Sequence, residues 1–139
     1  MVETVAEVMT DDPIVVDAQA RVSDAARLMR DGDIGDVIVT RNGRVSGVVT
    51  DRDIVVRTVA SDLDPSRTRI DEIASSDPTT IAPTAPLEDA VRLMRDKAIR
   101  RLPVVEGDRP VGVLSLGDLA IDRDPKSVLA DITEAAPNA

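Results

Sequence analysis

Two short motifs in the sequence place a hydroxyl three residues before a carboxylate, each directly after an apolar run. They are Thr50–Asp53 (Thr-Asp-Arg-Asp) and Ser115–Asp118 (Ser-Leu-Gly-Asp). At the start of a helix, free backbone N–H groups attract an anion such as phosphate, and the hydroxyl adds a donor. A carboxylate one turn into that helix can accept hydrogen bonds from the two neighbouring hydroxyls of a ribose. Gly47 and Gly112, three residues before each hydroxyl, permit close approach of another group to the backbone.

A plainer interpretation of the same motifs needs no ligand. In a capping box, the Thr or Ser before a helix and the acid three residues later each accept a hydrogen bond from the other's backbone N–H. Because this spacing is common at helix starts, the motifs alone do not separate a helix cap from a nucleotide site. Both interpretations stay open.

The composition narrows the chemistry that remains. The chain has no His, Cys, Phe, Tyr or Trp, which removes the usual zinc ligands and most nucleophiles and general bases. We therefore expect no metal site, no required cofactor and no enzymatic activity. A net charge of −9 argues against a general nucleic-acid binder. No apolar run approaches the roughly 20 residues of a membrane span, and the first ten residues lack a signal-peptide pattern, so we expect a cytoplasmic protein that does not enter a membrane.

The motifs recur because the sequence contains a gapless internal repeat. A shift of 65 residues places Arg27–Asp31 on Arg92–Asp96, both reading Arg-Leu-Met-Arg-Asp, and it places the first motif on the second. Each half has about 55 residues, a length at which a lone domain is marginal. The two halves are therefore expected to bury their sheets against each other.

Within each half the residue pattern predicts strand, helix, strand, strand and helix. Ile14–Val16 is typical of a short strand, and two further strands flank Asn42-Gly43, a strong hairpin-turn signal. The next helix is expected to begin near Asp51. Apolar residues at helical spacing mark the intervening helix of each half: Val22, Ala25, Ala26 and Met29, then Leu87, Ala90, Val91 and Met94. This order predicts an α/β sandwich whose helices cover one face of small sheets.

The same pattern predicts how the chain is divided. The first repeat spans residues 1–60, a linker with Asp64-Pro65 spans 61–69, and the second repeat spans 70–123. Residues 124–139 are expected to form a closing helix and a tail, because Val128, Leu129 and Ile132 lie at helical spacing.

The ordered pattern, occurring twice, resembles a tandem pair of cystathionine-β-synthase-type (CBS) domains. The resemblance is carried by Val8-Met9-Thr10, Asp12-Pro13, the Arg-Leu-Met-Arg-Asp helix end, the closing Gly47–Ile54 segment and, in the second copy, Ile99–Val105. The resemblance covers nearly the whole chain. Within that family, the chain is similar to small actinobacterial CBS-pair proteins of the hypoxic-response type. The resemblance implies two βαββα repeats related by a pseudo-two-fold axis, with helices packed on small sheets.

The resemblance also implies a function. Such pairs are non-catalytic regulatory modules that sense AMP, ADP, ATP or another adenosyl compound in two clefts between the repeats. The motif acid holds the ribose, which implies Thr50 and Asp53 in one cleft and Ser115 and Asp118 in the other. A homodimer that acts on an unidentified protein target is the expected assembly.

The remaining site residues are likewise implied by the resemblance. The base is expected against Ile14 and Val15 in the Asp118 cleft, and against Thr79 and Thr80 in the Asp53 cleft. Arg52 and Arg100 are expected to contact phosphate around Asp118. Gly117 and Gly35 stand at the matching positions of the other cleft, which must rely on Arg100 or Arg101. We therefore predict unequal sites, the Asp118 cleft being the tighter one for a charged nucleotide.

Three other functions compete with this one. The first alternative is a structural or interaction protein with empty clefts. In that case we expect Asp118→Ala to be nearly neutral and no nucleotide to change the stability of the protein. The chain is alternatively a regulatory fragment related to inosine-monophosphate dehydrogenase, in which such pairs are inserted. An enzymatic activity of its own would require turnover of a nucleotide without His or Cys.

Overall fold

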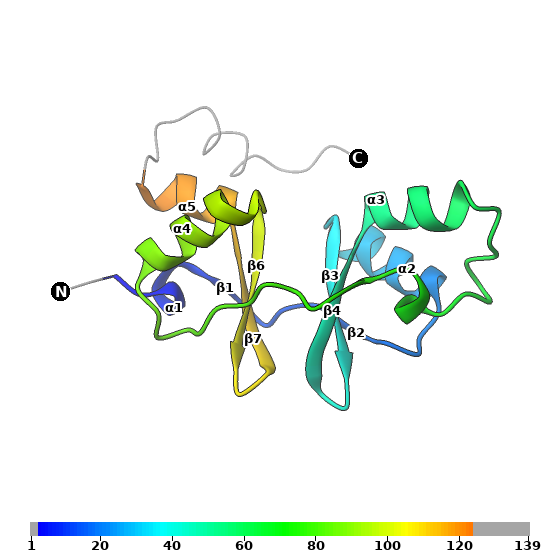
Figure 1. The fold of residues 1–139 in the computed structure, drawn as a ribbon, viewed down its shortest axis with the longest axis horizontal. Helices are drawn as coiled ribbons and strands as arrows, with labels where there is room; N and C mark the ends of the chain where they lie inside the picture. Colours follow the sequence, from blue (N-terminus) through cyan, green and yellow to red (C-terminus); the bar gives the residue numbers. More distant parts are fainter. Residues whose placement is uncertain (1–2, 124–139) are drawn as a thin grey trace. The chain divides into compact units, whose positions relative to one another are not determined.

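The structure, a computed structural model, describes residues 3–123, and these fall into two compact units. The continuous unit is Pro13–Pro78; the split unit joins Met1–Asp12 to Thr79–Ala139 and is described over 3–12 and 79–123. The predicted closing helix at 124–139 lies outside the described residues. Each unit packs helices on a small sheet, so the predicted α/β fold is confirmed (Figure 1).

The continuous unit is built around a four-stranded sheet in the order β2-β3-β4-β5. Strand β2 runs parallel to β3, and the other neighbours are antiparallel. Its elements are β2 (Val15–Asp17), α2 (Val22–Gly32), β3 (Asp36–Arg41), β4 (Arg44–Thr50), α3 (Asp51–Ile54), the π-helix η1 (Val55–Val59), the 3-10 helix η2 (Ile70–Glu72) and β5 (Ser75–Ser76).

The split unit has a three-stranded sheet in the order β1-β7-β6. Its elements are α1 (Val5–Val8), β1 (Thr10–Asp11), α4 (Leu87–Lys97), β6 (Arg101–Glu106), β7 (Arg109–Ser115) and α5 (Leu116–Arg123). The bounds of α4, β6 and β7 are those of α2, β3 and β4 shifted by 65 residues. Even the register shift between Val39 and Thr40 recurs between Val104 and Val105. The internal repeat is therefore a repeat of structure, but the predicted first strand of the second half is wrong: where the first half has β2, the second has only an isolated parallel bridge from Ile81 to Val104.

The predicted helix stripes form the two cores. Val22, Ala25 and Met29 are buried in the continuous unit, and Leu87, Ala90 and Met94 are buried in the split unit. Ala26, which the spacing placed on the same stripe, is exposed. The buried face of α2 centres on the line from Val22 through Ala25 to Met29, and Ala26 lies a further 100° around the helix.

Asn42 and Gly43 form the predicted hairpin turn between β3 and β4. Both have positive φ, at 55° and 77°, the signature of a two-residue type I′ turn. The repeat reverses the order of residue types: Gly107 and Asp108 have φ of 58° and 68° between β6 and β7. Asn, Asp and Gly are the residues that tolerate this left-handed backbone, so both hairpins are set by local sequence.

Each sheet is completed by a segment from elsewhere in the chain. Strand β5 pairs with β4 in the continuous unit, whereas β1, from near the N-terminus, pairs with β7 in the split unit. The amide of Val5 donates to the carbonyl of Ala85 at 3.0 Å, and that of Leu87 donates to Glu3 at 2.9 Å. The compact units are thus divided differently from the sequence repeats, whose boundaries stay a prediction.

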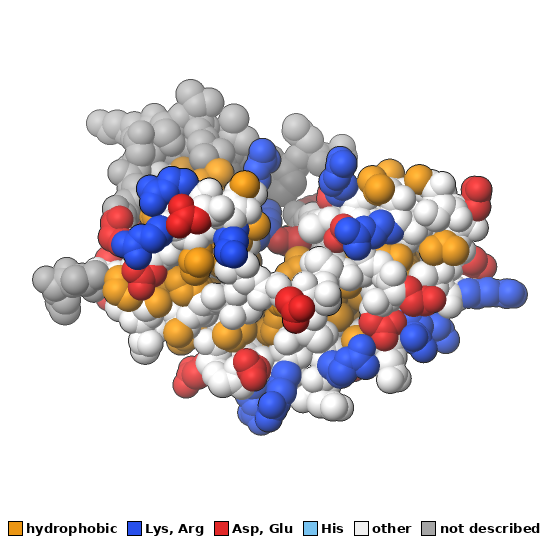
Figure 2. All heavy atoms as spheres, in the orientation of Figure 1, with side chains coloured by type: hydrophobic (Ala, Val, Ile, Leu, Met, Phe, Trp, Pro, Cys, Tyr) orange, Lys and Arg blue, Asp and Glu red, His pale blue; other side chains and the backbone are white. Residues whose placement is uncertain are grey.

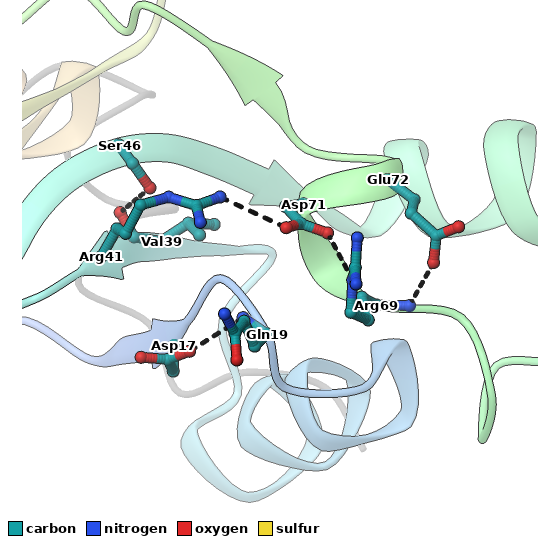
Figure 3. A network of polar contacts seen from close by, with 8 residues as sticks. All are labelled: Asp17, Gln19, Val39, Arg41, Ser46, Arg69, Asp71 and Glu72. Atoms are coloured by element: carbon teal, nitrogen blue, oxygen red, sulfur yellow. Dashed lines mark hydrogen bonds and ion pairs between the residues drawn. The ribbon is translucent and has the colours of Figure 1, made fainter.

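A polar network holds η2 against the sheet of the continuous unit (Figure 3). The carboxylate of Asp71 accepts hydrogen bonds from Arg41 Nη2 at 3.2 Å and from Arg69 Nε at 3.1 Å. Glu72 accepts from the backbone N–H of Arg69 at 2.6 Å. Because Arg41 ends β3, this network ties the segment before β5 to the sheet that β5 joins.

The predicted linker at 61–69 lies against the start of α2 within the continuous unit. The carbonyls of Thr68 and Pro65 accept from the amides of Val22 and Ser23, at 2.9 Å and 3.0 Å. These are N–H groups that the first turn of a helix leaves without a partner inside the helix. The linker therefore caps α2 instead of forming a free tether.

Candidate functional site

Both predicted motifs lie where a strand passes directly into a helix. Thr50 ends β4 and Ser115 ends β7. The first helical amide donates to an earlier carbonyl in each case: Asp51 to Gly35 at 2.9 Å and Leu116 to Arg100 at 2.8 Å. The strand and this hydrogen bond fix where each helix begins.

The hydroxyl and acid of each motif exchange hydrogen bonds with each other's backbone. The amide of Thr50 donates to Asp53 Oδ2 at 2.9 Å, and the amide of Asp53 donates to Thr50 Oγ1 at 3.0 Å. In the second motif, the amide of Ser115 donates to Asp118 Oδ2 and that of Asp118 donates to Ser115 Oγ, both at 3.0 Å. The capping-box interpretation is therefore confirmed in both motifs.

A capping box does not use every polar atom of the motif. Each hydroxyl accepts in the box, so its own hydrogen is left to donate to another group. Each carboxylate uses Oδ2 alone. Asp53 Oδ1 faces Arg57 Nε at 3.9 Å, whereas Asp118 Oδ1 has no hydrogen-bond or ion-pair partner among residues 3–123. The two acids thus differ in what remains for a ligand.

Three more of the predicted residues belong to the continuous unit with Thr50 and Asp53. Arg52 is exposed on α3, next to the motif acid. Ile14 packs against the core, and its carbonyl accepts from the amide of Ile38 at 3.2 Å. Val15 is 40% exposed in β2, which leaves an aliphatic surface for contact.

The other predicted residues belong to the split unit with Ser115 and Asp118. Arg101 lies opposite Ser115 in the register of β6 and β7, and Arg100 precedes it; both are exposed. Thr79 and Thr80 are half-buried, just before the parallel bridge from Ile81 to Val104. The predicted combination of residues from both units in one cleft stays a prediction.

The glycines before the motifs are closely approached by protein backbone. A Cβ on Gly47 would collide with the carbonyl oxygen of Ser75 in β5. On Gly112 it would lie 2.8 Å from the carbonyl oxygen of Thr10 in β1 and 2.6 Å from Met9 Sδ. Within each unit, the close approach that these glycines permit is that of the completing strand.

Sequence reasoning missed Arg57, which lies one turn after Asp53. Besides facing the Asp53 carboxylate, its Nη1 donates to the carbonyl of Ile73 at 3.1 Å. The available signal was the acid-to-Arg spacing of four residues on a helix, which favours an ion pair. The contact with Ile73 spans sixteen residues and has no local signal.

Among residues 3–123, no three carboxylates are grouped so as to hold a metal ion. No helix in that range is both long and apolar enough to cross a bilayer. Basic and acidic side chains are interspersed on the face drawn in Figure 2. The repeated helices show the same mixture, because Arg27 forms an ion pair with Asp24 and Arg92 forms one with Asp89.

The chain matches the family model described as "CBS domain" over residues 5–59 and 70–133. It is 37% identical to the CBS domain-containing protein YhcV of Bacillus subtilis, over 86% of this chain and 85% of that protein. It is 30% identical to hypoxic response protein 1 of Mycobacterium tuberculosis, over 84% of this chain and 82% of that protein. The structure of the CBS domain protein PAE2072 from Pyrobaculum aerophilum complexed with AMP matches this chain with a TM-score of 0.78 and 30% identity. The match covers 96% of this chain and 100% of that one. The chain therefore belongs to the CBS domain family, as a tandem pair of such domains.

Proposed function

We propose that this protein is a non-catalytic regulatory module that binds an adenine nucleotide or a related adenosyl compound through its strand-to-helix motifs. Asp118 accepts the ribose hydroxyls, and the Ser115 hydroxyl donates to the ligand. AMP is the first ligand to test, because a relative with 30% identity over 96% of this chain is known as an AMP complex.

One observation supports this proposal above the others. Asp118 holds its helix cap with Oδ2 alone, and within residues 3–123 its Oδ1 has no partner. A half-buried carboxylate oxygen with unused lone pairs is an acceptor for hydroxyl groups, and a charged acceptor forms the stronger hydrogen bonds. Capping the helix and binding a ribose are therefore compatible uses of one side chain.

The test is thermal unfolding, followed by circular dichroism, with and without AMP. A ligand at 100 times its dissociation constant stabilises the folded state by about 2.7 kcal/mol. We expect AMP to raise the melting temperature of the wild type, and Asp118→Asn to remove most of that shift. Asn keeps an oxygen for the cap but loses the charge that strengthens hydrogen bonds to a ribose.

Asp24→Asn is the matched control. Asp24 occupies the same helical position in α2, where its Oδ2 accepts from the backbone N–H of Arg21 at 2.9 Å. Both substitutions change a capping acid, so both lower stability without ligand, but only Asp118→Asn should reduce the AMP-dependent shift. An equal reduction in both variants would count against Asp118 as the ribose acceptor.

The confirmed capping boxes favour a second candidate, a structural or interaction protein. If capping is the only role of the motif acids, neither AMP nor S-adenosylmethionine nor NADH changes the melting temperature of the wild type. Asp118→Asn and Asp24→Asn then differ only in how far each lowers the melting temperature of the protein without ligand. This result would reject the sensor and retain the structural role.

We further propose that the protein works as a homodimer in the cytoplasm, acting on a protein target. Support comes from a row of exposed aliphatic side chains along η1, where Val55 is 58% exposed and Val59 is 63% exposed. Burying such side chains in a second copy removes apolar surface from water. Sedimentation equilibrium tests this: the wild type should be dimeric and Val59→Glu monomeric. A monomeric wild type would contradict the proposal.

A further inference from the structure

Arg57 places a positive charge beside the first motif acid, and no residue among 3–123 forms an ion pair with the second acid. Asp53 gives Oδ2 to the amide of Thr50 at 2.9 Å, and its Oδ1 lies 3.9 Å from Arg57 Nε. The Asp53 side chain is only 18% exposed. Both oxygens of Asp53 are therefore engaged inside the continuous unit before any ligand arrives.

The guanidinium of Arg57 is fixed from its other side. Its Nη1 donates to the backbone carbonyl of Ile73 at 3.1 Å, in a half-buried hydrogen bond. Ile73 is 1% exposed and belongs to the core of the same unit. A long side chain anchored on a rigid backbone loses less entropy in an ion pair than a free one does. Arg57 is thus held in place beside Asp53.

The split unit carries the opposite charge at the matching position. A shift of 65 residues from Arg57 leads to Asp122, four residues after Asp118 on α5. A carboxylate there cannot act as a counter-ion for Asp118. The repeat therefore conserves the motif acid and its cap while reversing the charge one turn later.

We infer that Arg57 is a specificity-determining residue, which occupies Asp53 as an internal counter-ion and so directs adenosyl binding to Asp118. This inference rests on the proposed function. A ribose that docks on Asp53 must first displace the guanidinium, while a ribose on Asp118 meets an oxygen without a partner among the described residues. The two motifs then share a backbone geometry but differ in ligand affinity.

Isothermal titration calorimetry with AMP tests the inference. The wild type should bind at one tight site, which Asp118→Asn removes and Asp53→Asn leaves. Adding Arg57→Ala to Asp118→Asn should restore binding, making it up to about fivefold tighter than in Asp118→Asn alone, the largest effect expected for loss of a half-exposed ion pair. Adding Asp53→Asn to that double variant should abolish the restored binding.

Arg92→Ala in the Asp118→Asn background is the matched control. Arg92 also pairs with an acid on its own helix, Asp89, at 3.6 Å, so its removal changes the net charge equally but should restore nothing. If Arg57→Ala does not fold, Arg57→Gln keeps a donor for the Ile73 carbonyl and removes the charge.

The outcomes separate the inference from the function on which it rests. If AMP binds the wild type and Arg57→Ala weakens or does not change binding in the Asp118→Asn background, the inference is wrong and the proposed function stands. If Asp53→Asn abolishes AMP binding and Asp118→Asn leaves it intact, the inference is likewise wrong and the proposed function stands. No AMP binding by the wild type, Arg57→Ala or Arg57→Gln rejects both.

Discussion

Gly112 and Thr10 meet backbone to backbone where β7 pairs with β1. A Cβ added to Gly112 would lie 2.8 Å from the carbonyl oxygen of Thr10. Real Cβ atoms essentially never come closer than 3.0 Å to such an atom, and a backbone carbonyl cannot rotate away as a side chain can. The glycine is therefore what allows an N-terminal strand to join this sheet. Gly47 stands in the same relation to Ser75 in the continuous unit.

Gly47→Ala and Gly112→Ala should each destabilise the protein by about 2 kcal/mol, the usual size of an overpacking penalty. Each added methyl group forces the completing strand away from its sheet. Urea unfolding followed by circular dichroism measures the change in the free energy of unfolding.

Gly32→Ala is the control for a glycine without this constraint. Its added Cβ would lie 3.0 Å from Ile14 Cδ1, the flexible end of a side chain. Gly32 ends a helix, where Ala has the better propensity by about 1 kcal/mol. We expect this variant to be neutral or stabilised. Losses of equal size in all three variants would contradict the role assigned to the strand contacts.

Local sequence patterns predicted the elements that local chemistry controls. The Asn42-Gly43 turn, the buried stripe through Val22 and Met29, and the helix start at Asp51 are all present. Each depends on residues within a few positions of one another. The repeat then carried the same predictions to the second half of the chain.

The completing strands could not be predicted in this way. Strand β1 has two residues, Thr10 and Asp11, too few to show the alternation that marks a strand. Its partner Gly112 lies about a hundred residues away, so no local period connects the two. The hydrogen bond of Arg57 to Ile73 is remote in the same sense. Local propensity is silent about which distant backbone group a strand or a guanidinium will meet.

Thr58→Val should stabilise the protein by about 1 kcal/mol. Thr58 is fully buried in η1, and its hydroxyl has no hydrogen-bond partner among residues 3–123. A buried polar group without a partner costs about 1–3 kcal/mol, and Val has nearly the same shape without that group. Urea unfolding of the variant and the wild type measures the difference.

Thr68→Val is the matched control for this substitution. Thr68 is also buried, but its hydroxyl donates to the carbonyl of Asp64 at 2.8 Å. Loss of that hydrogen bond should destabilise by about 1 kcal/mol. The two Thr→Val changes are thus expected to have opposite signs, and a shared sign would contradict the assignment of Thr58 as unpartnered.

Ser115→Ala should cost about 1 kcal/mol of folding free energy in the absence of any ligand. The side chain accepts the hydrogen bond of the Asp118 amide at 3.0 Å, and Ala offers no acceptor at this helix start. Ser115→Asn, which supplies a capping oxygen, should recover most of the loss. If Asn and Ala are equally unstable, the hydroxyl does not stabilise the protein as a cap.

The pH dependence of stability provides the last test, at Asp24. The backbone N–H of Arg21, followed by the side chain of Arg27, lowers the pKa of Asp24 below its ordinary value of 3.8. A carboxyl group with a lowered pKa in the folded state stabilises the protein above its unfolded pKa, and this contribution is lost as the pH falls through the folded value. Asp24→Asn should therefore lower the melting temperature at pH 7, and the gap to the wild type should close as the pH falls through the lowered pKa of Asp24. Asp89→Asn is the repeat-related control: Pro86 stands where Arg21 donates, so Asp89 receives no backbone N–H there. Asp89→Asn should therefore lower the melting temperature at pH 7 by less than Asp24→Asn does. A gap for Asp24→Asn that persists unchanged in acid, or one matched by Asp89→Asn at pH 7, would show that the amide of Arg21 does not stabilise the charged form.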